Sequence, residues 1–496
     1  MQFHLNGFKS SGDPLQALYE SDQEPDFQSL LPEQVDVLIV GAGPAGQLLG
    51  TGRRSTVPYD RDLRSIRIQR KGVMDALVVT DFPDVRLKTA IYSADEGSIL
   101  IIPREGGYLA RFYIELDKLK QDERIASKNV TAEVLIDRAQ RVFKPFKFEV
   151  RHIAYWSVYE VGQRLTDHFD DVPEAEREQR NARVFIAGDA CHTHSAKAGQ
   201  GMNVSMNDAY NLGWKLAAVL HGLADPKLLF TYTDERQGIA KLLIEFDGKI
   251  SKLFAAKPKN KAGKDDKDAV DPAVFQEYFQ RQGRFMAGVE TRYSPGLLTS
   301  GDTGQQDLAT GFEIGTRFHS CQVLRLADAK PIQLGHVMDA DGRWRIVLFG
   351  DKSEPNSSAS ALAKTCDFLY KKLLPRYTPA EADIDSVIDI GGILQQSRTS
   401  ISISDLPQIL LPHKGVLGIQ DYEKVFTDEE SYSFGFSKIY ESRGVSKEKG
   451  CLLVVRPDQY ISAVLPLGEE AHAPLENFFG GSMKDQRSSN GTNGHT

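Results

Sequence analysis

Residues 183–203, RVFIAGDACHTHSAKAGQGMN, place an apolar run, an acidic residue and a glycine pair in an order that suits cofactor binding. The apolar residues 183–187 predict a strand, which would deliver the Asp189 carboxylate to a strand end where it accepts hydrogen bonds from ribityl hydroxyls. Glycines let the backbone approach a bulky ligand, and a helix beginning near Met202 points unpaired N–H groups at a phosphate or an anionic ring. We therefore predict a flavin site, although an ordinary glycine-rich loop would give a similar pattern. Its expected cofactor-binding residues are Gly188, Asp189, Gly199, Gln200, Gly201, Met202 and Asn203.

A second glycine motif lies near the start of the chain. Residues 35–40, VDVLIV, predict a buried strand, and Gly41, Gly43 and Gly46 follow it as a GxGxxG pattern. Between a strand and a helix, these glycines allow a tight turn and close approach of the backbone to a pyrophosphate. A lone GxGxxG is a weak signal, but together with residues 183–203 it favours a flavin dinucleotide.

The two motifs together resemble the FAD-binding pair of the flavoprotein aromatic hydroxylases. Other segments are similar to the phenol 2-monooxygenase and 3-hydroxybenzoate 4-monooxygenase branches of that family: residues 1–8, 72–77, 80–84, 101–108, 111–113, 325–331 and 450–460. The resemblance therefore extends over almost the whole chain. It implies an α/β fold, with a glutathione-reductase-like Rossmann domain for FAD and NAD(P), a β-sheet substrate domain and a C-terminal thioredoxin-like α/β domain.

The resemblance also implies an activity. Enzymes of this family reduce FAD with NADPH, convert the reduced flavin and O₂ to a flavin hydroperoxide, and transfer oxygen to a phenol or hydroxybenzoate. We therefore expect an FAD-dependent aromatic monooxygenase. We also expect a homodimer, because a thioredoxin-like domain without a CxxC pair cannot run dithiol exchange and is left with packing or dimerisation.

Three further residues take roles from the resemblance. Tyr113 matches the tyrosine that hydrogen-bonds the phenol oxygen, and Arg104 matches an arginine near the flavin, so both are expected to be catalytic. Lys88 stands where the hydroxybenzoate branch has a lysine for the substrate carboxylate, so Lys88 and Tyr113 are expected to bind substrate. Each residue has a plainer explanation: a tyrosine on an amphipathic strand, an ion pair at a strand end and a surface lysine, respectively.

The chain departs from the family between Gly46 and Gly52, where only QLLGT intervenes. A Rossmann unit should form a second strand there and present an acidic residue about 20 residues on for the adenosine ribose. Residues 52–57 instead resemble the tail of the family's internal Asp-Gly motif, with Thr51 in place of its aspartate. We therefore predict weak FAD binding and turnover near background, because the segment with the family's catalytic aspartate would also be missing. A non-catalytic or truncated family member that keeps a dimerising domain is the alternative function.

The sequence CHTH beside Asp189 also suggests a metal site. Cys191, His192 and His194 do not form a closed zinc pattern, and the flavin interpretation accounts for the whole loop. We therefore expect no metal.

The composition excludes several classes of protein. Hydrophobic residues make up 41% and charged residues 26% of 496 residues, which is typical of a soluble globular chain with a sizeable core. A net charge of −8 leaves no general basic field for nucleic acid or an anionic membrane, and no apolar run approaches the ~20 residues of a spanning helix. Four widely spaced cysteines and no secretory signal indicate reduced thiols in the cytoplasm.

Four regions follow from the patterns along the chain. We assign residues 1–256 to an FAD-binding and substrate domain with an incomplete Rossmann unit, 257–310 to a linker and helix, 311–480 to the thioredoxin-like domain and 481–496 to a disordered tail. Helices are expected at residues 202–220, 226–254 and 272–286. Strands are expected at residues 344–349, 383–390, 451–455 and 461–465, with a helix that ends before Pro375.

Overall fold

The computed structural model describes residues 3–4, 7–8, 36–39, 43, 45, 68–93, 96–116, 130–194, 200–255, 272–301, 305–355, 357–432, 435 and 438–487. Three predicted cofactor-binding residues, Gly41, Gly46 and Gly199, lie outside these ranges, as does Thr51. The chain divides into a first unit, residues 40–209 and 232–289, and a second unit, residues 1–39, 210–231 and 290–496. Within the described ranges, no helix combines the length and apolar character needed to cross a membrane.

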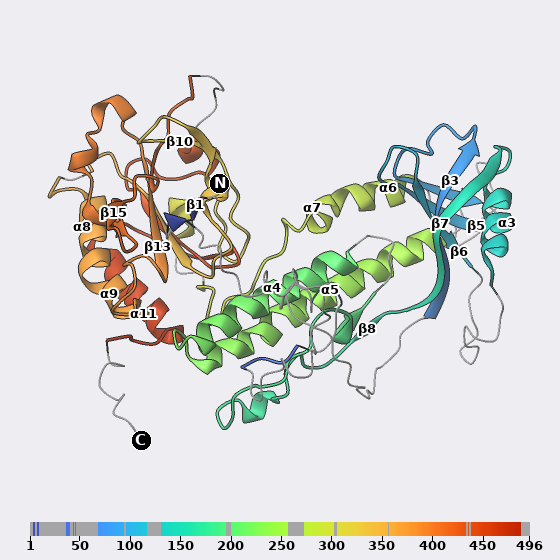
Figure 1. The fold of residues 1–496 in the computed structure, drawn as a ribbon, viewed down its shortest axis with the longest axis horizontal. Coiled ribbons are helices and arrows are strands. Elements are labelled where there is room, and N and C mark those ends of the chain that lie inside the picture. The colour runs from blue at the N-terminus through green and yellow to red at the C-terminus, as the bar shows by residue number, and fades with distance from the viewer. Residues whose placement is uncertain are drawn as a thin grey trace, which may run out of the picture. The chain divides into compact units, whose positions relative to one another are not determined.

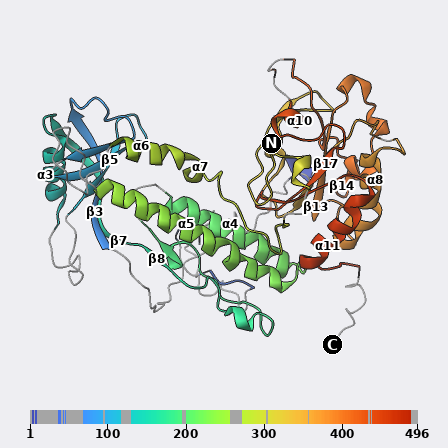
Figure 2. The ribbon, with the colours of Figure 1, turned by 180° about the vertical axis from the view of Figure 1, so that it is seen from behind.

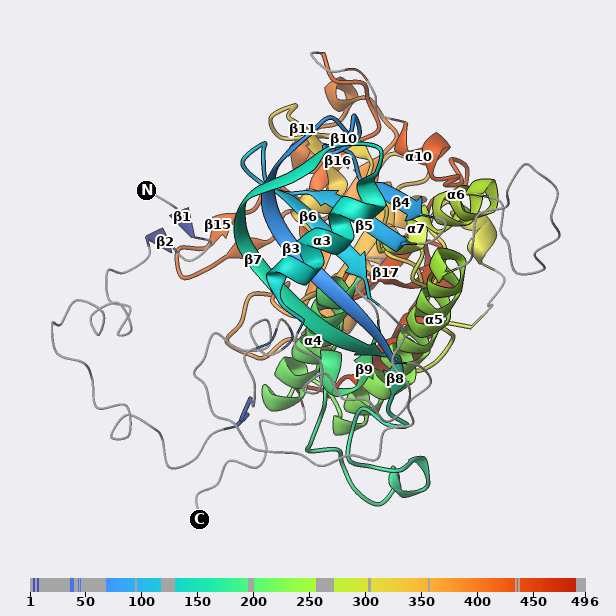
Figure 3. The same cartoon turned by 90° about the vertical axis from the view of Figure 1, so that its right-hand side faces the viewer.

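The first unit contains a five-stranded antiparallel sheet in the order β4-β5-β6-β3-β7 (Figure 1). Its strands are β3 (Ile68–Thr80), β4 (Thr89–Ser93), β5 (Gly97–Pro103), β6 (Ala110–Glu115) and β7 (Phe148–Gly162). Alternation on β6 buries Ala110, Phe112 and Ile114 on one face. That face packs against α3 (Ala132–Phe143), which lies across the sheet in Figure 3.

The opposite face of this sheet packs against helices. These are the start of α4 (Gly201–Leu220), then α5 (Phe230–Ala255), α6 (Pro272–Arg281) and α7 (Gly283–Met286). Leu100 of β5 shares an apolar cluster with Val204 of α4 and Phe246 of α5. The helices predicted from the sequence are confirmed, with a 3-10 turn at Pro226–Leu229 before α5 and a break between α6 and α7. The break precedes Gly283, a residue with low helix propensity.

Two strands predicted for the flavin-binding part do not form as predicted. Residues 36–39 form no strand and join none of the described sheets, and Leu38 is 71% exposed. Residues 183–187 contribute one isolated bridge, between Phe185 and Asp170. The predictions of a buried strand at residues 35–40 and of a strand at residues 183–187 are therefore wrong for the described residues. A buried parallel strand needs hydrogen-bonding neighbours and covered faces, and hydrophobicity alone does not supply them.

The second unit is built on a mixed sheet of seven strands in the order β11-β10-β16-β13-β12-β17-β18. Two of its strands, β13 and β17, are labelled in Figure 2. Its strands are β10 (Gln322–Arg325), β11 (Pro331–Gln333), β12 (Trp344–Phe349), β13 (Ile388–Leu394), β16 (Val425–Thr427), β17 (Cys451–Val455) and β18 (Ile461–Leu465). β12 pairs with β13 in parallel and with β17 in antiparallel fashion. All of its residues are buried, because its apolar side chains alternate between two core clusters, one on each face of the sheet. The predicted bounds of β12, β17 and β18 are confirmed.

The helices of the second unit differ from prediction around Pro375. α8 (Ala361–Phe368) continues through a π-helical turn, Leu369–Leu373, into α9 (Leu374–Tyr377), so the prediction of an end before Pro375 is wrong. Proline has no N–H to donate, and the start of a new helical turn is where this loss costs least. The other helices are α10 (Ile439–Ser442) and α11 (His472–Ser482).

Two boundaries also shift. The strand predicted at residues 383–390 begins at Ile388, because the Ser386 N–H donates to the Asp383 carbonyl (2.9 Å) in a turn that precedes it. At the C-terminal end, Asp485 accepts a hydrogen bond from Arg376 (2.9 Å). The described structure therefore continues to Arg487, beyond the boundary at residue 480 expected from composition.

Three short antiparallel pairs complete the described strands. They are β1 (Phe3–His4) with β2 (Gly7–Phe8), β8 (Arg164–Leu165) with β9 (His192–Thr193), and β14 (His413–Lys414) with β15 (Ile419–Gln420).

Candidate cofactor and substrate site

The Gly188–Ala190 segment forms a short 3-10 turn that holds Asp189. Gly188 has a φ of +62°, a left-handed conformation that favours glycine, and a Cβ there would lie 2.2 Å from the Ser205 hydroxyl oxygen of α4. Glycine therefore lets the turn lie directly against α4. The Asp189 residue is exposed, which is the placement that contact with a cofactor hydroxyl requires.

A buried aspartate on α4 fixes this turn. Asp208 accepts hydrogen bonds from the Gly188 N–H (3.2 Å) and from Nε of Arg236 (2.8 Å), and Nε2 of His192 lies 2.7 Å from its Oδ2 atom. Burial alone would raise the pKa of Asp208, but the Arg236 charge and the His192 hydrogen bond outweigh it, and the pKa is lowered. Asp208 therefore holds a negative charge that joins the turn, β9, α4 and α5.

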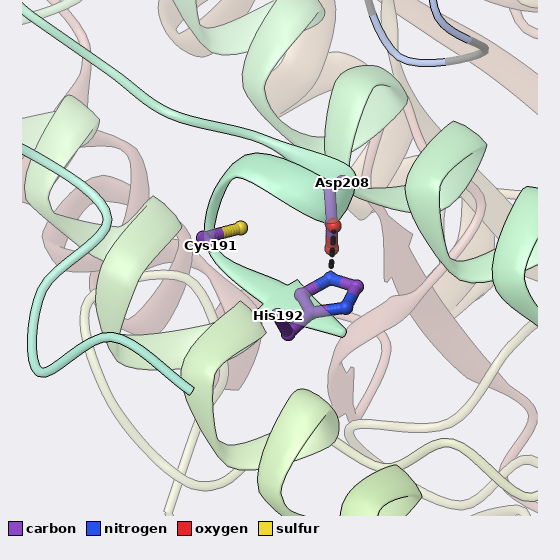
Figure 4. A group of neighbouring side chains, drawn as sticks. All are labelled: Cys191, His192 and Asp208. Carbon is purple, nitrogen blue, oxygen red and sulfur yellow. Dashed lines mark hydrogen bonds and ion pairs between the residues drawn. The ribbon is translucent and has the colours of Figure 1, made fainter. Parts of the chain in front are cut away.

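Cys191, His192 and Asp208 place potential metal ligands within 4.8 Å of one another (Figure 4). Other partners already engage these atoms, because Cys191 Sγ donates to the Gly188 carbonyl (3.2 Å) and Arg236 pairs with the same carboxylate. A metal cation would also have to share the cluster with the Arg236 guanidinium. We interpret the cluster as an anchor of the turn and keep the prediction that it binds no metal.

The beginning of α4 provides the second part of the predicted flavin site. Met202 and Asn203 are exposed, whereas Gln200 is buried and its Nε2 donates to the Met286 carbonyl (2.8 Å). The Gln200 side chain therefore contributes to packing of α7. A Cβ at Gly201 would make an ordinary contact with the His194 ring (3.7 Å), so Gly201 is less constrained than Gly188.

Tyr113 lies on the face of the five-stranded sheet that is opposite to α3. It packs in the cluster formed by Leu100, Val204, Leu243 and Phe246 and is half-buried. Val204 directly follows Asn203, so one apolar cluster joins the predicted flavin site to the predicted substrate tyrosine. The two predicted sites are therefore neighbours within the first unit.

Charged groups lie on the same face. By strand alternation this face carries Asp75, Arg104 and Arg111 with Tyr113, and Asp75 pairs with Arg111 across β3 and β6. The buried Asp75 carboxylate accepts from Arg111 Nε (2.6 Å) and Arg104 Nη1 (3.0 Å), and Arg104 also pairs with Glu105 (2.7 Å). Hydrogen bonding to Asp75, only partly opposed by burial, raises the pKa of Arg111. Arg104 therefore forms the strand-end ion pair that was the plainer explanation of its presence.

Lys88 immediately precedes β4. By strand alternation it lies on the same face as Ala90 and Tyr92, whose side chains pack in the cluster that contains Tyr113. The residue is exposed, yet burial of its ammonium group by neighbouring atoms lowers its pKa. A partly dehydrated ammonium group at the edge of an apolar cluster suits a carboxylate ligand.

These residues fit the flavin end of FAD. The exposed Asp189 carboxylate, the glycine that seats its turn and the exposed start of α4 supply a hydroxyl acceptor and the positive end of a helix dipole. At the adenosine end, Gly43 of the GxGxxG motif is exposed, and the other two glycines of the motif lie outside the described residues. The fit therefore concerns the ring and ribityl parts of the cofactor.

Comparison with known proteins identifies the family. Residues 51–247 match the FAD binding domain family, and residues 291–487 match the phenol hydroxylase C-terminal dimerisation domain. The chain is 51% identical over 421 residues to 3-hydroxybenzoate 4-monooxygenase of Comamonas testosteroni, covering 84% of this chain and 64% of that protein. The chain carries the FAD-binding and dimerisation domains of the phenol hydroxylase family. Its FAD-binding match begins at residue 51, after the GxGxxG motif.

Other relatives agree with this assignment. The phenol 2-monooxygenase fsqG of Aspergillus fumigatus is 34% identical, covering 82% of this chain and 64% of that protein. The chain thus spans less than two thirds of the length of these two relatives. The solved structure of the anhydrotetracycline hydroxylase OxyS of Streptomyces rimosus has a TM-score of 0.51 and 18% identity, covering 84% of this chain and 65% of that one. This likeness confirms the flavoprotein hydroxylase fold.

Sequence reasoning missed the partners that hold the predicted residues. Asp75 and Arg111 lie within the segments that carry the family resemblance, but no spacing rule links two residues on separate strands. Asp208 interrupts the apolar pattern of α4, and this was the available signal. A charged residue at a core-facing helix position implies a buried partner, which is Arg236.

Proposed function

We propose that this chain is an FAD- and NADPH-dependent monooxygenase that hydroxylates a phenol bearing a carboxylate, such as a 3-hydroxybenzoate. The observation that carries the proposal is the shared sheet face of Lys88, Arg104, Arg111 and Tyr113, which joins the start of α4 through one apolar cluster. A cationic edge beside a tyrosine suits a ring that carries both a carboxylate and a hydroxyl group.

Each residue then has a role in binding or orientation. The Tyr113 hydroxyl hydrogen-bonds the phenol oxygen, Lys88 pairs with the substrate carboxylate, and the apolar cluster excludes water from the ring. Asp189 accepts from a cofactor hydroxyl, and the first turn of α4 directs N–H groups toward the flavin ring. When bound, FAD would activate O₂, and one oxygen atom of the O₂ enters the ring.

A carboxylate free to deprotonate the phenol is not among the described residues of this face. Asp75 is engaged by two guanidinium groups, and Glu115 accepts a hydrogen bond from the Ser98 hydroxyl (2.7 Å). The family's phenol-activating aspartate has no counterpart in QLLGT. We therefore propose that turnover is lower than in complete relatives by about 10²–10⁴, the usual contribution of a positioned acid–base group.

We further propose that the protein is a cytoplasmic homodimer. The match to a dimerisation domain over residues 291–487 supports the dimer, and four free cysteine thiols support a reducing compartment.

The experiment is a product assay with 3-hydroxybenzoate, NADPH and ¹⁸O₂, with FAD in excess so that weak binding is offset by mass action. The Comamonas testosteroni relative is assayed beside it. We expect slow formation of a ring-hydroxylated product that contains one ¹⁸O atom and requires both FAD and NADPH. Absence of product when a titration shows bound flavin would exclude the hydroxylase and leave the non-catalytic alternative.

A further inference from the structure

A β-hairpin in the second unit exposes aliphatic side chains at its tip. Its strands, β14 and β15, pair Lys414 with Ile419, and the Gly418 N–H donates to the Gly415 carbonyl (3.0 Å) to close the turn. The two corner positions are Val416 and Leu417, which are 98% and 76% exposed. Corners of tight turns usually carry Gly, Pro, Asn, Asp or Ser, so two aliphatic residues there are not explained by turn formation.

The base of the hairpin is fixed to the rest of the unit. Lys414 Nζ pairs with Asp385 (2.9 Å) and Asp421 (2.8 Å), and the Gly415 N–H donates to the Asp383 carboxylate (3.0 Å). These contacts orient the strands before any partner binds. Because the tip is already ordered, association loses less conformational entropy there than it would at a mobile loop.

Exposed apolar residues of this domain are concentrated on the hairpin. Ile419 and Tyr422 are exposed beside Val416 and Leu417, whereas elsewhere in the described part of residues 291–487 the exposed large hydrophobic residues are Leu297 and Tyr432. An apolar projection flanked by charged residues is the arrangement expected of a protein–protein contact, whose centre is apolar and whose rim is polar.

We propose that the tip, Val416 and Leu417, is a central contact between two copies of this chain. The proposal rests on the homodimer proposed above and names the surface that forms it. The hairpin lies within residues 291–487, which match a dimerisation domain, so the expected partner is a second copy. In a two-fold contact the same patch meets itself, and residues 415–419 carry no charge that such a contact would leave buried and unpaired.

The test compares the full-length chain with the Val416→Ser/Leu417→Ser variant by sedimentation velocity over a range of concentrations. We expect the dimer dissociation constant to rise about 30-fold or more, the effect of losing a hot spot. Tyr432→Ser, which removes another exposed hydrophobic side chain of the same domain, is the matched control and should leave the constant unchanged. Thermal unfolding verifies that both variants are folded.

The possible outcomes separate the two proposals. A wild-type dimer whose dissociation constant is the same in the double variant would overturn the hairpin contact and leave the homodimer standing. A wild-type monomer at every concentration would overturn both.

A second measurement does not depend on the stability of the double variant. In Leu417→Cys, a short bifunctional maleimide should join two chains, because the tips meet in the dimer. Cross-linking no greater than in wild type would contradict the proposal.

Discussion

Nε2 of His192 lies 2.7 Å from Oδ2 of Asp208, and both side chains are almost completely buried. The same carboxylate receives the Gly188 N–H, so one aspartate on α4 sets the position of the turn that presents Asp189. The geometry of the predicted flavin site therefore depends on a residue that is not expected to touch the cofactor.

Replacing Asp208 with Asn should be strongly destabilising. The variant leaves the buried Arg236 guanidinium without its anionic partner, and loss of one member of a buried ion pair costs about 3–5 kcal/mol. Urea unfolding measures the change. The control is Asp234→Asn on α5, whose ion pair with Arg177 (2.9 Å) is largely exposed on the aspartate side and should be worth about 1 kcal/mol or less. Equal losses in the two variants would contradict the role given to Asp208.

Gly188 and Gly201 offer a matched pair of substitutions. Gly188→Ala must place a Cβ 2.2 Å from the Ser205 hydroxyl oxygen at a positive φ, and we expect a loss of about 1–3 kcal/mol in the free energy of unfolding. Gly201→Ala meets only an ordinary contact at 3.7 Å and should be neutral or slightly stabilising, because alanine favours helix. Chemical denaturation distinguishes them, and a neutral Gly188→Ala would show that the turn does not need glycine.

Elements with unambiguous patterns could be predicted from the sequence. β12, β17 and β18 are short apolar runs bounded by turn residues, and apolar residues recur along α4 at helical spacing, so local information was sufficient. Residues 36–39 show the limit, since a hydrophobic run becomes a strand only when other strands pair with it. Pro375 shows another limit, because a π-helical turn before a proline has no sequence signal among the rules of helix termination.

The functional site, like the fold, could be predicted only in part from the sequence. The start of α4 near Met202 followed from the sequence, whereas Asp189 lies in a 3-10 turn and not at the end of the predicted strand. The ion pairs of Asp75 and Asp208 join residues that are distant in sequence, and such contacts depend on strand register and helix packing. Pattern reasoning on one sequence does not determine either of these.

The stability of the fold should depend on the protonation of His194. Burial lowers its pKa, partly opposed by Asp247, Asp189 and Asp208, while His192 adds to the lowering. Below about pH 6.5, the ordinary pKa of histidine, the unfolded chain therefore binds more protons at this position than the folded chain does. The stability associated with a neutral His194 is fully present above about pH 6.5 and falls as the pH drops toward the folded-state pKa. The free energy of unfolding, measured in urea at pH 7.5 and at pH 5, should fall less between the two pH values in His194→Gln than in wild type. An unchanged loss would exclude this contribution.

Cofactor retention tests the interpretation of the junction at Gly46–Gly52. The second Rossmann strand and the ribose-binding acid have no counterpart in QLLGT, so FAD should dissociate from the purified protein during gel filtration. Inserting a family-length segment between Gly46 and Gly52 should restore a flavin spectrum to the protein peak. A stoichiometric spectrum retained by the chain as it stands would contradict this interpretation.

The most direct measurement of the central claim compares the binding of 3-hydroxybenzoate and phenol to wild type and Lys88→Met. If the sheet face that carries Tyr113 selects a carboxylated phenol, Lys88→Met should weaken the binding of 3-hydroxybenzoate about tenfold or more and leave the binding of phenol unchanged. This is the effect of removing a charged partner from a carboxylate. Lys241→Met, an exposed lysine of α5, is the control and should bind both ligands as wild type does. Equal weakening of the two ligands by Lys88→Met, or no weakening of either, would contradict the proposed substrate class.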